Sequence, residues 1–265
     1  MTQATQKKTI LSIEHVAVHF GGLVAISDMT FDVKEGELLS LIGPNGAGKT
    51  TAFNVVTGFL RPTKGEVHFR GVALHKLKPH EIAGTGLVRT FQKTSLFTTN
   101  TVFDNVLTGL HRHGSASSWA TMLALPSMKR EEAHLREKVW EILDFIGIAH
   151  RANELGGSLP YGEQRLLGVA VALAADPSML LLDEPAAGMN PSETADFMAL
   201  LAKIRKRGIS ILLVEHDMPL VMGVSDRIVV LNYGKIIANG TPAEIQANPE
   251  VIQAYLGQGV KHAAA

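Results

Sequence analysis

The eight residues Gly43-Pro44-Asn45-Gly46-Ala47-Gly48-Lys49-Thr50 have the types and spacing needed to hold a chain of phosphates. They match the pattern G-x-x-x-x-G-K-[ST] in full and lie between an apolar run and a helical pattern, which is the context this motif requires. Glycines let successive backbone N–H groups point at phosphate oxygens, and the N-terminus of the following helix favours negative charge. Lys49 is expected to neutralise the β- and γ-phosphates, and Thr50 to bind Mg²⁺. The alternative is a chance glycine turn before a helix, which the full match and its context disfavour.

Two acidic residues, Asp183 and Glu184, follow the apolar run of residues 179–182. A carboxylate at the carboxyl end of a buried strand suits a second contact to Mg²⁺ through water, which is the role expected of Asp183. Glu184 stands one residue further on, where it could orient or deprotonate a water that attacks the γ-phosphate. Viewed alone, the pair could be two solvated carboxylates at a strand end. A phosphate-binding motif in the same chain favours the catalytic interpretation.

His216 follows a second apolar run, residues 209–214. Parallel strands of an open sheet share one carboxyl edge, where ligands bind, so His216 can approach the phosphate motif and the acidic pair. We therefore expect His216 to contact the γ-phosphate, rather than to be a surface or core histidine. The other histidines are interpreted as structural, since His111 and His113 lack further ligands at metal-binding spacing.

A helix start is expected at Leu159-Pro160-Tyr161-Gly162-Glu163-Gln164, immediately before an apolar helical pattern. Proline and glycine punctuate the start, and the free N–H groups of a helix N-terminus can receive an anion. Taken alone, the segment is only a helix N-terminus.

Short apolar runs and helical patterns alternate along the chain, and they correspond to the strands and helices that must position these residues. Such alternation indicates a parallel sheet covered on both faces. From about Lys93 to Pro177 helical patterns dominate, and residues 113–127 are expected to form a loop or short hairpin. The sequence therefore predicts an α/β core of residues 1–92 and 178–265, interrupted by a helical subdomain of residues 93–177. Individual strands are expected at 10–18, 24–33, 38–42, 66–69, 179–182, 209–214 and 228–231, and helices at 50–57, 102–110, 131–146, 163–175 and 192–205.

Composition narrows the class of protein. The chain has 265 residues, 46% of them hydrophobic and 19% charged, which is enough to bury a sizeable core. Its 25 Lys and Arg balance 25 Asp and Glu, which argues against binding nucleic acid through phosphate contacts. The absence of cysteine excludes a disulfide framework, a thiolate metal site and a cysteine nucleophile. A polar N-terminus and the lack of a membrane-spanning apolar run predict a soluble, intracellular protein.

The order of these motifs resembles that of the ATP-binding cassettes of ABC transporters, over about residues 10–257. The resemblance implies a P-loop NTPase (RecA-like) core with a mainly parallel sheet, an N-terminal antiparallel β subdomain and an inserted α-helical subdomain. It also implies that residues 159–164, in the place of the signature motif L-S-G-G-Q, contact the γ-phosphate of an ATP held by a second cassette in a head-to-tail dimer. Pro160 stands where that motif has serine, so backbone N–H groups and Gly162 would have to replace the hydroxyl.

By the same resemblance, Gln92 matches the Q-loop glutamine near Mg²⁺ and the transmembrane contact. Residues 187–190 match the D-loop, with Asn190 where Asp is commoner, and Phe20 matches the aromatic residue that stacks on adenine, although a lone Phe could equally belong to the core. The expected catalytic residues are Glu184 and His216. The expected Mg²⁺ contacts are Thr50, Gln92 and Asp183. The expected ATP contacts are Phe20, Asn45, Gly46, Ala47, Gly48, Lys49, Thr50, Thr51, Gln92, Leu159, Tyr161, Gly162 and Glu163.

A finer resemblance is to the ATPase subunits of branched-chain (hydrophobic) amino-acid importers, the G-type of their two cassettes. Segments such as 88–92, 159–165, 215–218 and the tail 238–257 carry it. It implies an ATPase on the cytoplasmic face of the inner membrane, with two permease subunits, a second cassette and, indirectly, an extracytoplasmic substrate-binding protein as partners. The alternatives are a urea or amide importer, a lipid-type exporter, a soluble ABC ATPase acting on ribosomes or DNA, and a non-catalytic nucleotide sensor. The last predicts loss of Lys49, Glu184 or His216, and all three are present.

Overall fold

The computed structural model describes residues 7–90, 96–110 and 126–259. Its strands are β1 (Thr9–Phe20), β2 (Leu23–Lys34), β3 (Leu38–Ile42), β4 (Lys64–Phe69), β5 (Val72–Ala73), β6 (Leu87–Arg89), β7 (Met179–Asp183), β8 (Ser210–Val214), β9 (Arg227–Asn232) and β10 (Lys235–Gly240). Its α-helices are α1 (Lys49–Val56), α2 (Pro79–Gly84), α3 (Val102–Leu110), α5 (Pro126–Ile146), α6 (Tyr161–Ala174), α7 (Pro191–Lys206), α8 (Met218–Val224), α9 (Pro242–Ala247) and α10 (Pro249–Gly259), with short 3₁₀ turns η1 (Leu74–Lys76), η3 (Ala149–Arg151) and η4 (Gly156–Ser158).

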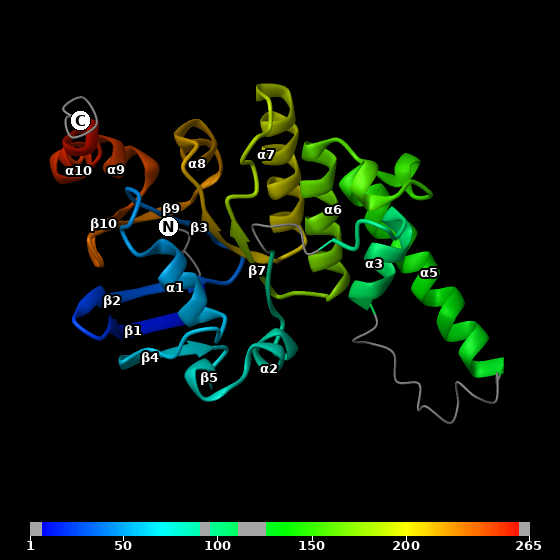
Figure 1. Ribbon diagram of the computed structural model, residues 1–265, viewed down its shortest axis with the longest axis horizontal. Helices are drawn as coiled ribbons and strands as arrows, with labels where there is room; N and C mark the ends of the chain where they lie inside the picture. Colours follow the sequence, from blue (N-terminus) through cyan, green and yellow to red (C-terminus); the bar gives the residue numbers. More distant parts are fainter. Residues whose placement is uncertain (1–6, 91–95, 111–125, 260–265) are drawn as a thin grey trace, which may run out of the picture. The chain divides into compact units, whose positions relative to one another are not determined.

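The strands form one sheet in the order β5-β4-β1-β2-β10-β9-β3-β8-β7-β6. Five neighbours, β9, β3, β8, β7 and β6, pair in parallel, whereas β10 runs antiparallel to β9. Strands β1, β2, β4 and β5 pair antiparallel and extend the sheet on the other side (Figure 1). The expected α/β class, with a mainly parallel core and an N-terminal antiparallel part, is therefore confirmed.

The centre of the parallel part is buried along its whole length. Every residue of β3, β7 and β8 is buried, and the three strands carry Leu, Ile, Val and Met almost exclusively. Continuous apolar runs of this kind are typical of strands covered on both faces. Because the three strands are parallel neighbours, their carboxyl ends lie at one edge, and the segments that follow them meet there.

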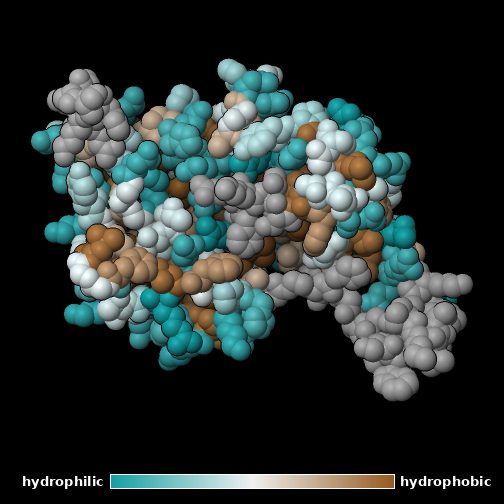
Figure 2. Space-filling view, viewed as in Figure 1, coloured by the Kyte–Doolittle hydropathy of each residue, from teal (hydrophilic) through white to brown (hydrophobic). Residues whose placement is uncertain are grey.

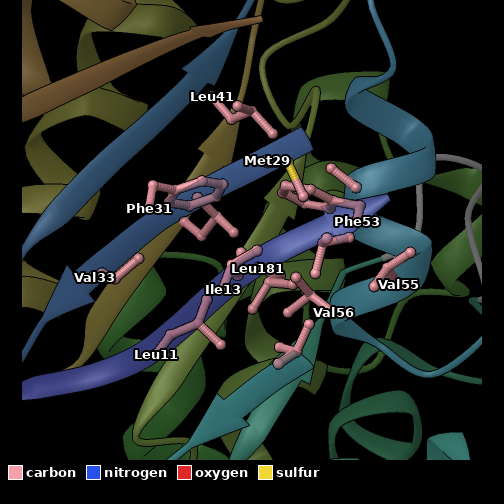
Figure 3. Close-up of a cluster of buried hydrophobic side chains, with 14 of the residues drawn as sticks. Leu11, Ile13, Met29, Phe31, Val33, Leu41, Phe53, Val55, Val56 and Leu181 are labelled. Carbon is pink, nitrogen blue, oxygen red and sulfur yellow. The ribbon is translucent and has the colours of Figure 1, made fainter. Parts of the chain in front are cut away.

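Helix α1 is held on the sheet by one apolar cluster (Figure 3). Phe53 of α1 is fully buried among side chains that include Met29 of β2, Leu41 of β3 and Leu181 of β7. Burying a side chain of this size contributes about 1.5–3 kcal/mol relative to leaving it in water. This packing fixes the start of α1 relative to the sheet edge from which the preceding loop emerges.

Two compact units divide the chain, one of Met1–Arg89, Ser178–Glu184 and Thr194–Ala265, the other of Thr90–Pro177 and Pro185–Glu193. The second unit contains α3, α5 and α6. Within this unit, the absence of a side chain at Gly109 allows α3 to lie close to α6, since a Cβ atom there would lie 2.6 Å from the Val171 carbonyl oxygen. Among the residues that the structure describes, no helix is both long and apolar enough to cross a membrane.

The expected strand 38–42 and helix 102–110 coincide with β3 and α3, whereas α5 begins at Pro126 rather than at residue 131. The expected loop at 113–127 otherwise lies outside the described residues. Strand β10 and helices α8, α9 and α10 were not predicted, because their short, half-exposed segments show little hydrophobic periodicity.

Candidate nucleotide site

The phosphate motif forms the loop between β3 and α1, and two of its glycines are required by close approach to neighbouring backbone. A Cβ atom on Gly43 would lie 2.0 Å from the Leu231 carbonyl oxygen, and one on Gly48 would lie 2.9 Å from that of Ala25. Gly46 has φ +79 and faces open space. The loop is therefore pressed against β9 and β2 at its two ends, while its middle stays open to a ligand.

Lys49, the first residue of α1, bends back over the loop. Its Nζ donates to the carbonyl oxygens of Gly43 at 2.6 Å and Pro44 at 3.0 Å. Burial lowers the pKa of the Lys49 ammonium below its usual value, although the charges of Glu184 and Asp183 oppose that shift. The ammonium thus lies within the field of both carboxylates.

Asp183, at the end of β7, is only 2% exposed and forms a buried ion pair. Its Oδ2 accepts a hydrogen bond from Arg89 Nη2 at 2.7 Å. Burial raises the pKa of Asp183, and the hydrogen bond and charge of Arg89 oppose the increase. Arg89 is itself oriented by Asn54 Oδ1, 2.8 Å from Nη1, and its guanidinium lies 5.5 Å from the centre of the Phe53 ring. Sequence reasoning gave Arg89 no role, because its partners come from two segments, α1 and β7, that are far apart in the sequence.

Glu184 and His216 approach each other at the same edge. Glu184 has φ +47, a region that few non-glycine residues adopt, and its N–H donates to the Val214 carbonyl of β8 at 2.8 Å. His216 Nδ1 lies 3.9 Å from Glu184 Oε1, which is beyond hydrogen-bond distance, and the histidine side chain is 66% exposed. The two side chains are therefore close enough together, and exposed enough, for one small ligand to contact both.

Most of the remaining expected contacts in this unit are at least partly accessible to solvent. Asn45, Gly46 and Thr50 are exposed, Gly48 and Thr51 are half-buried, and Ala47 is buried within the loop. Phe20, at the end of β1, is 50% exposed and so is not a core residue. Gln92 lies outside the described residues.

Tyr255 of α10 is a further residue near the phosphate loop that sequence reasoning missed. Burial raises the pKa of its phenol to about 12, and the neighbouring Gly43 backbone opposes that increase. The ring packs against the cluster that contains Ile42, the last residue of β3. No motif spacing signals such a contact, because it joins the chain's last described helix to its third strand.

The segment 159–164 begins α6 in the second unit. Pro160 is the residue before the helix, and Gln164 Nε2 donates to the Leu159 carbonyl at 2.9 Å. Tyr161 is exposed, whereas Leu159 and Gly162 are buried. Glu163 is ion-paired with Arg151, whose Nε lies 3.0 Å from Oε2. A Cβ atom on Gly162 would lie 2.9 Å from the carboxyl group of Glu193, so that glycine makes room for an acidic side chain.

Residues 187–190 lie beside this helix start within the same unit. Gly188 has φ +82, and a Cβ atom there would lie 2.8 Å from the Tyr161 ring. Asn190 Oδ1 accepts from the backbone N–H groups of Ser192 and Glu193, both at 3.0 Å. An Asn side chain therefore satisfies the start of α7, as the more common Asp would.

Comparison with known proteins places this geometry in a family. A model of the ABC transporter family matches residues 26–187, and a model of the branched-chain amino acid ATP-binding cassette transporter matches residues 235–261. The chain is 44% identical to the high-affinity branched-chain amino acid transport ATP-binding protein BraF of Pseudomonas aeruginosa, over 95% of this chain and 99% of that protein. It is also 44% identical to the corresponding protein LivG of Escherichia coli K12, over 94% and 98% of the two chains.

The fold agrees with solved structures. The crystal structure of the ADP conformation of an ATP-binding cassette of an ABC transporter superposes with a TM-score of 0.82 at 31% identity, covering 94% of this chain and 99% of that one. The ABC transporter family model, which matches residues 26–187, spans the phosphate loop, the acidic pair and the helix start of α6. The chain therefore belongs to the ABC transporter family, as an ATP-binding cassette related to those of branched-chain amino acid transport.

Proposed function

We propose that this chain binds Mg²⁺ and ATP at Gly43–Thr50 and hydrolyses the ATP to drive import of branched-chain amino acids. The observation that carries the proposal is the convergence, within one unit, of Lys49, Asp183, Glu184 and His216 on the sheet edge beside the phosphate loop. Its relatives of 44% identity are named for branched-chain amino acid transport, which supports the choice of cargo.

Lys49 is proposed to bind the phosphates. Among the described residues, the hydrogen bonds of its ammonium go to two neutral carbonyl oxygens. A phosphate oxygen carries negative charge whereas these carbonyl oxygens are neutral, so a bound triphosphate would draw Nζ away from Gly43 and Pro44. Exposed Thr50 and the open loop at Gly46 would face the same phosphates. The start of α1 adds its dipole.

Glu184 is the proposed general base or water-orienting residue, and His216 is the proposed contact to the γ-phosphate. Their side chains lie 3.9 Å apart, and both are accessible. Glu184 would take the proton of the attacking water, and His216 would hold an oxygen of the group being transferred. General-base catalysis of this kind contributes about 10²–10⁴-fold in rate.

The residues present fit a magnesium ion carried by the nucleotide. Mg²⁺ is usually held by one or two protein oxygens together with substrate phosphates and waters. The Thr50 hydroxyl and the Asp183 carboxylate are hard oxygen donors, and the described residues contain no cluster of three metal-ligating side chains that would form an independent metal site. Bound there, the ion would offset negative charge on the phosphates. Gln92 is proposed as a further contact from the resemblance alone.

Residues 159–164 are proposed to act on a nucleotide held by a second cassette. Backbone N–H groups at the start of α6 would donate to the γ-phosphate, so the missing hydroxyl at Pro160 would be dispensable. The expected assembly consists of two cassettes, two permease subunits on whose cytoplasmic side the cassettes bind, and an extracytoplasmic binding protein for the cargo.

Co-purification from native membranes in mild detergent tests this proposal. Two multi-span proteins, a second cassette and a binding protein that prefers leucine, isoleucine or valine are the expected partners. A binding protein selective for urea would correct the cargo alone. The recovery of ribosomal or other soluble partners only would contradict the transport function.

A further inference from the structure

The turn between β9 and β10 carries an aromatic residue in an unfavourable backbone conformation. Its two central residues, Tyr233 and Gly234, have φ +44 and φ +73. Positive φ at both positions is the pattern of a type I′ turn, in which Asn, Asp or Gly is strongly preferred at the first position. A tyrosine there costs backbone free energy, and the residue is 73% exposed, so burial of the ring does not offset that cost.

This turn is fixed to the phosphate loop. The Gly234 N–H donates to the carbonyl oxygen of Ala47 at 2.9 Å, and Ala47 lies in the middle of the phosphate motif. The Gly234 carbonyl accepts from the backbone N–H and the hydroxyl of Ser27 at 2.9 Å and 3.1 Å. Tyr233 is therefore one residue away from a direct bond to the loop that would hold the phosphates.

Other exposed apolar side chains lie on the neighbouring hairpin. Strand β10 pairs with β2, and a Cβ atom on Gly234 would lie 2.6 Å from the Ala25 carbonyl, which places the turn beside the β1–β2 hairpin (Figure 1). Phe20, Leu23 and Val24 of that hairpin are all exposed. Figure 2 shows brown surface gathered at the left of the view, over this part of the molecule.

We propose that Tyr233 is a second aromatic contact for the base of the bound nucleotide, in addition to Phe20. The inference rests on the proposed function, since it requires a nucleotide with its phosphates in the loop. A purine extending from the loop toward the hairpin would pass the β9–β10 turn, and a tyrosine ring offers a flat face for stacking. Packing within the fold does not explain an exposed tyrosine in this backbone conformation, whereas stacking on a base would.

A single substitution separates this role from a structural one. Asn suits the first position of a type I′ turn, so Tyr233→Asn relieves the backbone cost while it removes the ring. A structural role predicts loss of thermal stability in this variant. A base-binding role predicts equal or higher stability together with weaker nucleotide binding.

The experiment compares the affinity of the full chain for ATP with its affinity for inorganic tripolyphosphate, by calorimetry. Tyr233→Asn is expected to bind ATP at least about fivefold more weakly, the lower end of what a base–aromatic stack contributes. Its affinity for tripolyphosphate should not change, because that ligand has no base. Tyr233→Phe should retain the wild-type ATP affinity, and Val72→Asn, an exposed position on β5, serves as the matched control.

Unchanged ATP affinity in Tyr233→Asn would overturn the inference, as would an equal loss of affinity for both ligands. Both outcomes would leave the nucleotide site intact, provided that Lys49→Ala abolishes binding of ATP. Failure of the wild-type chain to bind either ligand, or unimpaired binding by Lys49→Ala, would instead contradict the proposed function and the inference with it.

Discussion

The phosphate loop and the start of α6 both present the N-terminus of a helix, but their surroundings differ in charge. Lys49 lies over the first, with Asp183 and Glu184 close enough to act on its pKa. The second has acidic neighbours, because Glu193 lies against Gly162 and Glu163 is held by Arg151. The ammonium at the first site is hydrogen-bonded to neutral carbonyl oxygens, which a polyanionic ligand can replace. At the second site Arg151 is already paired with Glu154 and Glu163, and Arg165 donates to the Tyr161 hydroxyl.

This difference suggests that the two helix N-termini have separate roles in binding and in hydrolysis. A helix N-terminus next to carboxylates binds a free phosphate poorly, since like charges repel, but it can contact a phosphate already held and partly neutralised elsewhere. The phosphate loop would thus determine affinity, and the start of α6 would act only on the reaction. Substitutions at the two sites can therefore separate ATP affinity from ATP hydrolysis.

Lys49→Ala should have the largest effect. It removes the ammonium from beside Asp183 and Glu184, so a phosphate would meet two carboxylates without their cation. Truncating one member of a close charge pair costs about 2–5 kcal/mol of binding free energy. Calorimetric titration with ATP should show this loss, and wild-type affinity in the variant would mean that the loop does not bind the phosphates.

Glu184→Gln should separate binding from turnover. The amide keeps the size of the side chain but cannot accept a proton, so ATP hydrolysis should fall by about 10²–10⁴-fold. Calorimetry should find ATP affinity retained. Steady-state phosphate release equal to that of the wild type would remove Glu184 from the mechanism.

Gly162→Asp tests the second helix start. It adds a carboxylate beside Glu193, where the γ-phosphate of another cassette is proposed to dock. Loss of an oxyanion-type donor set costs about 10²–10³-fold in rate, whereas the ATP affinity of the monomer should not change. Gly162→Ala is the matched control, because its methyl group displaces only the flexible end of Glu193 and should cost less. A collapse of monomer affinity in Gly162→Asp would contradict the contrast between the two sites.

Arg89→Met should destabilise the fold, since it leaves the Asp183 carboxylate buried without its partner. Breaking a buried ion pair costs about 3–5 kcal/mol. Burial already raises the pKa of Asp183 in the folded chain, and loss of Arg89 would raise it further. The folded state then binds more protons than the unfolded state, so stability falls as pH rises above the usual aspartate pKa of 3.8. Denaturant unfolding should therefore show a smaller deficit near that pKa than at neutral pH, and a pH-independent deficit would exclude Asp183 as its source.

Glu163→Gln should have the smallest effect of the set. The Arg151 pair is partly exposed, and solvent-screened pairs of this kind contribute little to stability. Neither the melting temperature nor monomer ATP affinity should change appreciably. A large loss of hydrolysis would show that the Glu163 carboxylate has a direct role at the nucleotide, beyond its ion pair.

The phosphate loop was predictable from sequence because its chemistry is local: the glycines, Lys49 and Thr50 are consecutive residues between a strand and a helix. The apolar runs of β3, β7 and β8 implied parallel strands with a shared carboxyl edge, though not their order in the sheet, so Glu184 and His216 could be expected to approach each other. The Arg89–Asp183 pair could not, because the choice of a buried partner depends on tertiary packing. Positive φ at Tyr233 and the position of Tyr255 against Gly43 have no signature in sequence spacing for the same reason.

The mass of the Glu184→Gln chain in solution with ATP, measured by light scattering, tests the proposed roles of both helix N-termini together. The measurement should be made with the chain alone and after adding the second cassette recovered by co-purification. If the phosphate loop binds the nucleotide and the start of α6 completes the site of another chain, ATP should produce a dimer that Gly162→Asp abolishes without loss of bound ATP. A chain that binds ATP yet stays monomeric under both conditions, or a dimer indifferent to Gly162→Asp, would contradict the account.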